Sequence, residues 1–333
     1  MSRSYRTKLL VADTYAHELA SAISSAKQRV AIITTTLRAD DDRSEAIIAA
    51  LCDAADRGVE VSVLADTFTY LEPKEFILFA PRRQPARALR ALQLERRLKA
   101  HGIHFHWLGR KSHVIITGRT HSKWAIVDDI AYTFGGINLD RESFDNIDYM
   151  FKLQNPTFAQ KLQHEHERIR RADKGGAGIL NHSITLDNNS TVHIDGGIIG
   201  GSRIYRRCYQ LALEATDITL VSQYCPTGFF MRILRHKNAT LYYNHWRNAS
   251  LANRILIGLG VLTSRSSTYY HHDTYLHAKF VIFTRPDGTK VAIAGSHNFM
   301  RGSGMVGTRE IAIETTDTEI IAQLESFLEQ HVA

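Results

Sequence analysis

The chain has 333 residues, of which 44% are hydrophobic and 23% charged, and its formal net charge at pH 7 is +7. This composition excludes a disordered chain, and the length suits about two globular domains of roughly 150 residues each. The basic balance favours anionic partners such as nucleic acid, acidic lipid headgroups or phosphate esters, although general solubility explains so modest an excess equally well.

Three cysteines are present, and their spacing is typical neither of a metal site nor of a disulfide framework. We therefore expect core thiols and a reducing, cytoplasmic compartment. No targeting segment is visible near the N-terminus. The longest apolar run, residues 255–262, is too short to span a bilayer, so a lipid substrate would be reached by peripheral contact with the membrane.

The first part of the chain alternates between helical and β patterns. Residues 17–26 and 44–57 are predicted helices, and residues 30–35 and 59–66 are predicted strands. Gly58 follows the second helix at a position typical of a helix C-terminus. The order of helices and strands favours a largely parallel sheet.

Residues 73–99 are unusually basic, and Leu89, Leu92 and Leu98 recur there at roughly helical spacing. An amphipathic surface helix explains this pattern, and so does a basic helix that contacts anionic headgroups or nucleic acid. The basic side chains of the segment are Arg82, Arg83, Arg87, Arg90, Arg96, Arg97 and Lys99.

Residues 102–107 alternate as a strand that places His104 and His106 on one side. A pair of histidines needs at least a third ligand to hold a metal ion, and the neighbouring sequence offers no convincing one. We therefore expect no metal site in this chain.

The polar residues between 121 and 138 are spaced like those of a catalytic site. His121 and Lys123 stand two positions apart at the start of an apolar, β-prone run, residues 124–127, so their side chains point to the same side. Asn138 returns after a short turn. An imidazole that can attack phosphorus, with an ammonium and an amide that can hold charged oxygens, suits a phosphoryl group.

A second copy of this pattern makes chance an inadequate explanation. His277 and Lys279 precede the apolar run 280–283, and a Gly-Ser-His-Asn sequence at 295–298 follows a hairpin signal, Asp287-Gly288. One copy in each half of the chain predicts an internal repeat.

The predicted domains are residues 1–171 and 203–333. A helix at 156–171 closes the first domain. The segment 172–202 is rich in Gly, Asn, Ser and Asp, and we interpret it as a linker that carries a short strand near 191–194.

The two motifs resemble those of the phospholipase D superfamily: H-x-K, four residues, D, six residues, then G-[SG]-x-N. The first copy fits at His121, Lys123, Asp128, Gly135, Gly136 and Asn138. The second fits at His277, Lys279, Gly295, Ser296 and Asn298, but Thr284 stands where the Asp is expected and the hairpin before the glycine is longer. The family also has an acidic residue after each Asn, for which Asp148 and Glu310 are the candidates.

This resemblance implies an α/β fold of two repeats, each a mixed, mostly parallel β-sheet flanked by helices. One active site would lie on a pseudo-twofold axis between them in a monomer, with no metal and no cofactor. It further implies that His121 is the nucleophile that forms a phosphohistidine, that His277 is the general acid and then the base, and that Asp148 and Glu310 fix the imidazole tautomers.

The remaining motif residues would bind phosphate or support the site. Lys123, Lys279, Asn138, Asn298 and Ser296 would hold the phosphate oxygens. Asp128 would order its strand and turn rather than the phosphate, and Thr284 can serve there because it still forms hydrogen bonds. The alternative is that the substitution at Thr284 marks a second motif that is degenerate and inactive.

Three functions fit these motifs. The first is a cardiolipin synthase-like phosphatidyltransferase or phospholipase D acting on phospholipids, favoured by two motifs on one chain and by the basic segment. The second is a phosphodiesterase acting on nucleic acid, which the basic charge also suits. The third is an inactive module that binds anionic lipid or nucleic acid.

Overall fold

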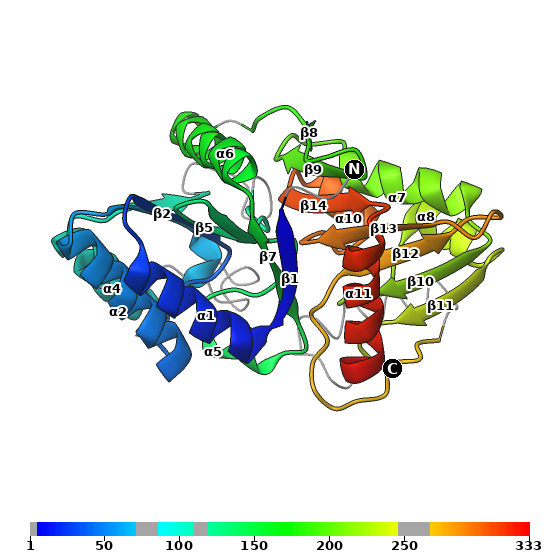
Figure 1. The fold of residues 1–333 in the computed structure, drawn as a ribbon, viewed down its shortest axis with the longest axis horizontal. Coiled ribbons are helices and arrows are strands. Elements are labelled where there is room, and N and C mark those ends of the chain that lie inside the picture. The colour runs from blue at the N-terminus through cyan, green and yellow to red at the C-terminus, as the bar shows by residue number, and fades with distance from the viewer. Residues whose placement is uncertain (1–4, 71–85, 110–118, 177, 246–266) are drawn as a thin grey trace.

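The computed structural model describes residues 5–70, 86–109, 119–176, 178–245 and 267–333, which form two halves that lie side by side (Figure 1). Each half contains a seven-stranded sheet. The first sheet runs, in order, β1 (Arg6–Val11), β7 (Tyr149–Gln154), β6 (Ile130–Thr133), β5 (Trp124–Val127), β2 (Arg29–Thr34), β3 (Glu60–Asp66) and β4 (His104–Leu108). The second runs β11 (Asn238–Tyr242), β10 (Asp217–Val221), β12 (Phe280–Thr284), β13 (Lys290–Gly295), β14 (Arg309–Thr315), β9 (Ser190–Gly196) and β8 (His182–Thr185).

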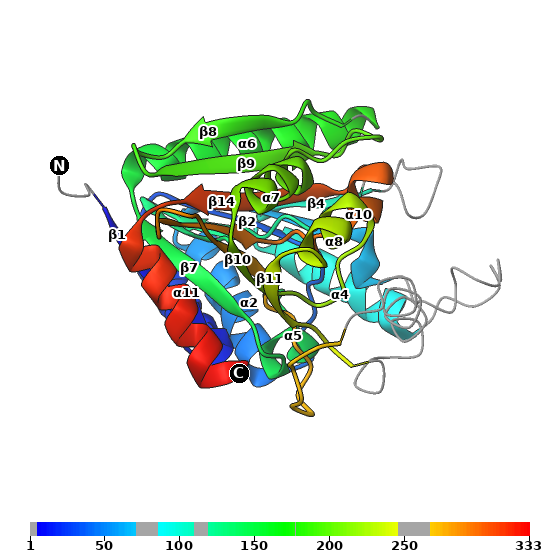
Figure 2. The ribbon, with the colours of Figure 1, turned by 90° about the vertical axis from the view of Figure 1, so that its right-hand side faces the viewer.

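Helices cover both sheets (Figures 1 and 2). Those of the first half are α1 (Ala12–Ser25), α2 (Asp42–Asp56), α4 (Ala86–Ala100), α5 (Arg141–Asp145) and α6 (Pro156–Gly175), with the 3-10 turn η1 (Thr67–Thr69). Those of the second half are α7 (Arg203–Glu214), α8 (Gly228–Leu234), α10 (Arg301–Met305) and α11 (Thr318–His331). The α/β fold of two repeats with mixed sheets flanked by helices is confirmed.

The two sheets repeat one strand order. Strands β1, β7, β6, β5, β2 and β3 of the first correspond to β9, β14, β13, β12, β10 and β11 of the second. The register agrees as well. Trp124 and Phe280 are the residues that follow the two motif lysines, and they pair with Ile33 of β2 and Val221 of β10. The duplication seen in the two motifs therefore extends to the whole sheet.

This correspondence changes the interpretation of residues 172–202. The second repeat begins at β9, which pairs along its length with β14, and β8 adds an edge strand beside it. The strand expected near 191–194 lies within β9. The segment is thus not a simple linker. Its polar composition belongs to a short edge strand and to the turn at 186–189, where few apolar side chains are needed.

The expected parallel character of the sheets is wrong. Among the described strands only the neighbours β2–β3, β3–β4 and β10–β11 run parallel, and the other pairs are antiparallel. The helix–strand alternation that indicated parallel pairing holds only at the start of each repeat. Beyond it, hairpins such as β5–β6 and β12–β13 return the chain antiparallel.

Three apolar cores hold the layers together. One lies between the first sheet and helices α1, α2 and α4, and another between the second sheet and helices α7 and α8. The central core joins side chains of both sheets, such as Trp124 and Phe280, to α6 and α11. Because this core is shared, the two halves pack against each other through apolar side chains.

Helix α4 lies within the basic segment, and of the three leucines expected on its apolar face only Leu98 is fully buried. Ala91, Leu94 and Leu98 are buried, whereas Leu89 is 48% exposed. Arg82 and Arg83 lie outside the described residues, as does the apolar run 255–262. In the part of the chain that the structure describes, every helix is too short or too polar to cross a membrane.

The first motif glycine offers a test of the packing. A Cβ on Gly135 would lie 1.7 Å from the carbonyl oxygen of Tyr149, on the neighbouring strand. We expect Gly135→Ala to lower the free energy of unfolding by about 3 kcal/mol or more, because backbone must move apart. Gly175→Ala is the control, since its Cβ would meet nothing within 4 Å. Urea unfolding should separate the two variants; equal midpoints would contradict the packing described.

Candidate active site

Backbone hydrogen bonds between the halves bring the two H-x-K segments together. The N–H groups of His121 and Ser122 both donate to the carbonyl oxygen of Arg309, at 2.9 Å. In the same way, the N–H groups of His277 and Ala278 donate to the carbonyl oxygen of Ile147, at 2.9 and 3.0 Å. The accepting residues immediately precede Glu310 and Asp148. Each histidine therefore lies beside the acidic residue of the other half.

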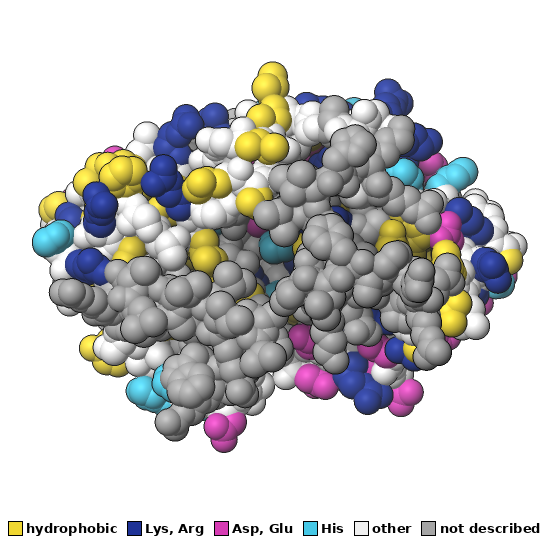
Figure 3. Space-filling model, turned by 180° about the vertical axis from the view of Figure 1, so that it is seen from behind, with side chains coloured by type: hydrophobic (Ala, Val, Ile, Leu, Met, Phe, Trp, Pro, Cys, Tyr) yellow, Lys and Arg dark blue, Asp and Glu magenta, His cyan; other side chains and the backbone are white. Residues whose placement is uncertain are grey.

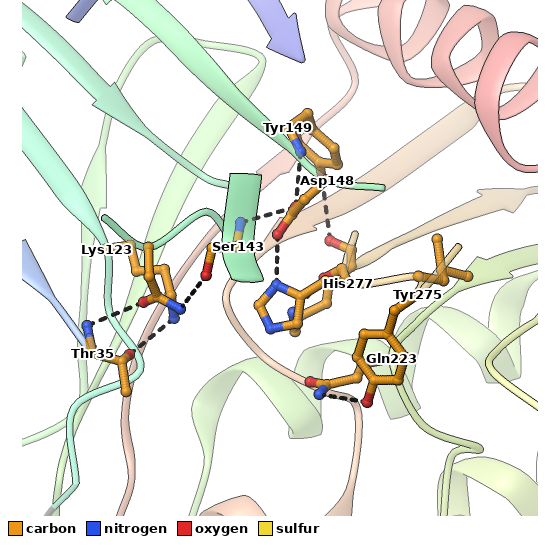
Figure 4. A network of polar contacts seen from close by, with 12 residues as sticks. Thr35, Lys123, Ser143, Asp148, Tyr149, Gln223, Tyr275 and His277 are labelled. Carbon is orange, nitrogen blue, oxygen red and sulfur yellow. Dashed lines mark hydrogen bonds and ion pairs between the residues drawn. The ribbon is translucent and has the colours of Figure 1, made fainter. Parts of the chain in front are cut away.

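The side chains repeat this crossed pairing. His277 Nδ1 lies 2.6 Å from Asp148 Oδ2, and His121 Nδ1 lies 3.3 Å from Glu310 Oε1 (Figure 4 shows the first pair). Both carboxylates are buried. Burial by itself would raise their pKa values, but the imidazole opposite each carboxylate holds its pKa below the usual range. An ionised acid at Nδ1 keeps a proton there and leaves Nε2 of each ring to face a substrate.

Gly136 shows how closely the two motifs approach. A Cβ on this residue would lie 2.4 Å from Asp148 Oδ2, 2.9 Å from His277 Nδ1 and 3.0 Å from Lys279 Nζ. Its N–H donates to Asp148 Oδ1 at 3.2 Å. Only glycine leaves space here for the second-half side chains. The matching residue of the second motif, Ser296, instead donates its hydroxyl to Glu310 Oε2 at 2.5 Å.

Both motif lysines are buried in the site. Lys123 Nζ donates to Thr35 Oγ1 at 3.0 Å (Figure 4) and to the carbonyl oxygen of His121 at 2.9 Å. Lys279 Nζ donates to the carbonyl oxygen of His277. Burial lowers the pKa of Lys123, and burial with repulsion from Lys123 lowers that of Lys279 to about 7. An incoming phosphate would offset this cost by supplying the missing negative charge.

The pKa of His277 is lowered to about 4, by burial first and by the charge of Lys279 second. Its bond to Asp148 acts in the opposite direction but is outweighed. The ring is therefore neutral near pH 7. A bound phosphate anion would raise this pKa, since an opposite charge favours the protonated form.

The two motif asparagines differ in their surroundings. Asn138 Oδ1 accepts from the N–H of Thr35 at 3.2 Å, and its Nδ2 donates to Ser143 Oγ at 3.1 Å. Both the oxygen and the nitrogen of this amide thus take part in holding the residues after β2 next to α5. Asn298 is buried, and its Oδ1 has no hydrogen-bond partner among the described residues. Phosphate binding by Asn138, Asn298 and Ser296 stays a prediction.

Asp128 lies away from the histidines, at the turn between β5 and β6. Its carboxylate accepts from the N–H groups of Lys27, Gln28 and Arg29, at 3.0, 2.9 and 3.0 Å. In the second half the carbonyl oxygen of Thr284 accepts from the N–H of Thr216 at 2.8 Å. A backbone acceptor there performs part of the same anchoring. Gly295 repeats the tight packing of Gly135, since its Cβ would lie 2.2 Å from the carbonyl oxygen of Ile311.

Several residues that shape the site were not found from the sequence. Asp66, at the end of β3, is buried, accepts from the N–H of Thr120 at 2.8 Å and pairs with Arg119 at 3.1 Å. Asn244 occupies the equivalent place in the second half, where its Oδ1 accepts from the N–H of Leu276 at 2.8 Å. The available signal was a polar residue at the end of a strand or just beyond it, Asp66 closing β3 and Asn244 two residues after β11.

A third residue of this kind is His297, whose ring interacts with the charge of Glu310. His297 is buried, and burial lowers its pKa despite the attraction of Glu310 and Asp195. In the first motif the same position is Ile137. In the parts of the chain that are described, no three His, Cys, Asp or Glu side chains gather in a way that could hold a metal ion, and His104 and His106 gain no third ligand.

Comparisons with known proteins agree with this architecture. A family model described as "Cardiolipin synthase, PLD-like domain" matches residues 19–170. Phosphatidylserine synthase from Haemophilus influenzae Rd KW20 has a similar structure, with a TM-score of 0.72 and 13% identity over 98% of this chain and 86% of that chain. Polyphosphate kinase from Porphyromonas gingivalis has a TM-score of 0.61 and 14% identity over 98% of this chain and 46% of that chain. A search of curated proteins found no match.

The low pKa of His277 predicts a pH dependence of stability. The unfolded chain takes up a proton at this ring near its usual pKa of about 6.5, whereas the folded chain does so only near pH 4. Stability should therefore fall as the pH drops from 7 to 4, by up to about 3 kcal/mol from this group. Urea unfolding across that range should show a shallower fall for His277→Asn. His17→Asn, on the exposed face of α1, should follow the wild type; parallel curves for all three proteins would contradict the assignment.

Proposed function

Because the chain belongs to the phospholipase D superfamily, we propose that it cleaves or transfers phosphodiesters of phospholipids through a phosphohistidine intermediate. The observation that carries the proposal is the crossed pairing, in which each histidine is bound at Nδ1 by the acid of the other half. Two imidazoles with free Nε2 atoms, beside two buried lysines, are the groups that a two-step displacement at phosphorus requires.

The first step forms a bond from His121 Nε2 to phosphorus and breaks the bond to the leaving alcohol. His121 suits attack because its side chain is 31% exposed, against 14% for His277. His277 gives its Nε2 proton to the departing oxygen, after the phosphate charge has raised its pKa. In the second step His277 takes a proton from water or an acceptor alcohol, whose oxygen displaces His121 from phosphorus.

The other groups bind and orient. Lys123 and Lys279 would hold the non-bridging oxygens, since buried ammonium groups stabilise the charge that develops on them. The amides of Asn138 and Asn298 and the hydroxyl of Ser296 would assist. Asp148 and Glu310 hold the rings in one tautomer and stabilise the imidazolium form when it appears. No step in this scheme calls for a metal ion or another cofactor.

Phospholipid is favoured as substrate over nucleic acid. The matching family model is described as a cardiolipin synthase domain, and one structure that is similar over most of both chains is that of a phosphatidylserine synthase. On the face in Figure 3, the visible described Lys and Arg side chains form separate groups rather than one continuous stripe. The net charge of +7 keeps a nuclease as the second candidate.

Product analysis separates the candidates. The protein is incubated in excess EDTA with mixed anionic phospholipids and, separately, with single-stranded and double-stranded DNA, and products are identified by mass spectrometry. We expect phosphatidyl transfer or hydrolysis products from lipid alone, with activity that persists in EDTA because the lysines supply the positive charge. Products from DNA alone would support the nuclease. Activity that is lost in EDTA and restored by a divalent ion would contradict the scheme. If no substrate gives a product, the inactive binding module is the remaining candidate.

A nitrophenyl phosphodiester tests the roles of the two histidines. Nitrophenolate leaves without much acid catalysis, so His277→Asn should still allow attack by His121. Breakdown of the intermediate needs the missing base, so this variant should release about one nitrophenol per chain and then nearly stop. An acid-labile phosphoryl adduct should appear on the His121 peptide.

His121→Asn is the matched control, and it should show no burst. A burst in this variant instead would reverse the roles of the two rings. Steady turnover without a burst in both variants would refute a phosphohistidine at either position.

A further inference from the structure

A cavity of about 560 Å³ lies between α4 and the segment that follows β2, apart from the histidines. We call it the α4 pocket. It is lined by Leu37, Arg38, Ala39, Asp40, Thr69, Arg87, Arg90, Ala91, Gln93, Leu94 and Arg97. Four of these residues are arginines and one is acidic, so the lining is strongly basic. The reaction described above uses none of them.

Two of the four arginines are engaged in holding α4 in place. Arg87 donates from Nε to the carbonyl oxygen of Thr69 at 2.7 Å and from Nη2 to that of Phe68 at 3.0 Å, which ties the helix to η1. Arg97 donates from Nη1 to Glu45 Oε1 at 2.5 Å, which ties it to α2. These contacts place a rigid arginine-bearing helix face along one wall of the pocket.

The other two arginines keep guanidinium donors that a ligand could use. Arg90 is exposed and makes no hydrogen bond or ion pair with another described residue. Arg38 is more telling, because its Nε is buried and has no hydrogen-bond partner in the described part of the chain. Its Nη1 lies 3.7 Å from Asp140 Oδ2 and 3.9 Å from Asp40 Oδ2, which is longer than a hydrogen bond. A buried guanidinium donor without a partner is costly, and an anion in the pocket would satisfy it.

The segment that lines the α4 pocket continues directly from residues that contact the two motifs. Arg38 stands three residues after Thr35, whose hydroxyl accepts from Lys123, so the backbone between them spans at most about 10 Å. The N–H of Arg38 donates to the carbonyl oxygen of Leu139 at 2.9 Å, and Leu139 directly follows Asn138. One substrate pair could therefore occupy both places at once.

We propose that the α4 pocket binds a second phosphate group, carried by the acceptor or leaving alcohol, beside the phosphodiester that reacts at the histidines. This assignment rests on the proposed function. Arginines recognise phosphate through paired N–H donors. The cavity is larger than a phosphate ion, and Leu37, Ala91 and Leu94 add an apolar wall for the carbon part of a phosphate ester. A glycerol phosphate group has this combination.

Binding to the full chain tests the pocket independently of turnover. Calorimetry with sn-glycerol 3-phosphate should show that Arg90→Gln and Arg38→Gln each raise the Kd about tenfold, because each removes a charged donor. Arg96→Gln is the matched control, since Arg96 is exposed on the same helix and does not line the pocket. An unchanged Kd in Arg90→Gln would overturn the proposal even if Arg38→Gln failed to fold.

Two further measurements connect the pocket to the reaction. In a transfer assay, the preference for glycerol 3-phosphate over glycerol as acceptor should fall about tenfold in Arg90→Gln and stay unchanged in Arg96→Gln. An unaltered preference would refute the role in catalysis. If the wild type transfers nothing, the proposed function fails, while calorimetry still reports on the pocket. Weaker binding only to vesicles containing phosphatidylglycerol, with an unchanged Kd for glycerol 3-phosphate, would identify a membrane contact and overturn the subsite.

Discussion

The candidate active site depends on two short backbone contacts between the halves of the chain. The segment that begins each H-x-K motif hydrogen-bonds to the residue before the acid of the opposite half, through the carbonyl oxygens of Arg309 and Ile147. These bonds fix the relative position of two motifs that neither sheet could set alone. The central core, shared by α6, α11 and both sheets, keeps the contacts from sliding. Apolar packing thus holds the halves together, and directional backbone bonds align them.

Alignment matters because the site concentrates buried charge. Two lysines, two carboxylates and the His277 ring are largely removed from water, and Asp148, His277 and Lys279 gather around Gly136. Such a cluster is tolerable only when opposite charges face each other, and the crossed histidine–acid pairs meet that need. Burial lowers the pKa values of the two lysines and of His277, so their charged forms gain stability when an anion lies beside them. A phosphate diester supplies such a charge, so the electrostatics of the fold already favour its proposed ligand.

The two repeats are similar in backbone and different in detail. The first motif has glycine where the second has Ser296, because Gly136 lies against His277 and Lys279. The first has Ile137 where the second has the buried, titratable His297. The surroundings of the two H-x-K histidines are consequently unequal, and so is their exposure. Unequal surroundings are what a pair of histidines needs to take different parts in one reaction.

The sequence by itself determined the two motifs, the strands that carry them and the existence of a repeat. Local spacing contains this information, because a strand places His121 and Lys123 on one side and apolar runs predict burial. Only the tertiary structure decided the rest. It assigned Asp148 to His277 across 129 positions, started the second repeat at β9 and set Arg38 beside α4. It also made most strand pairs antiparallel. These features arise from contacts between segments that are distant in sequence. Which segments meet depends on how the two sheets pack, and the residues adjacent to each segment do not contain that information.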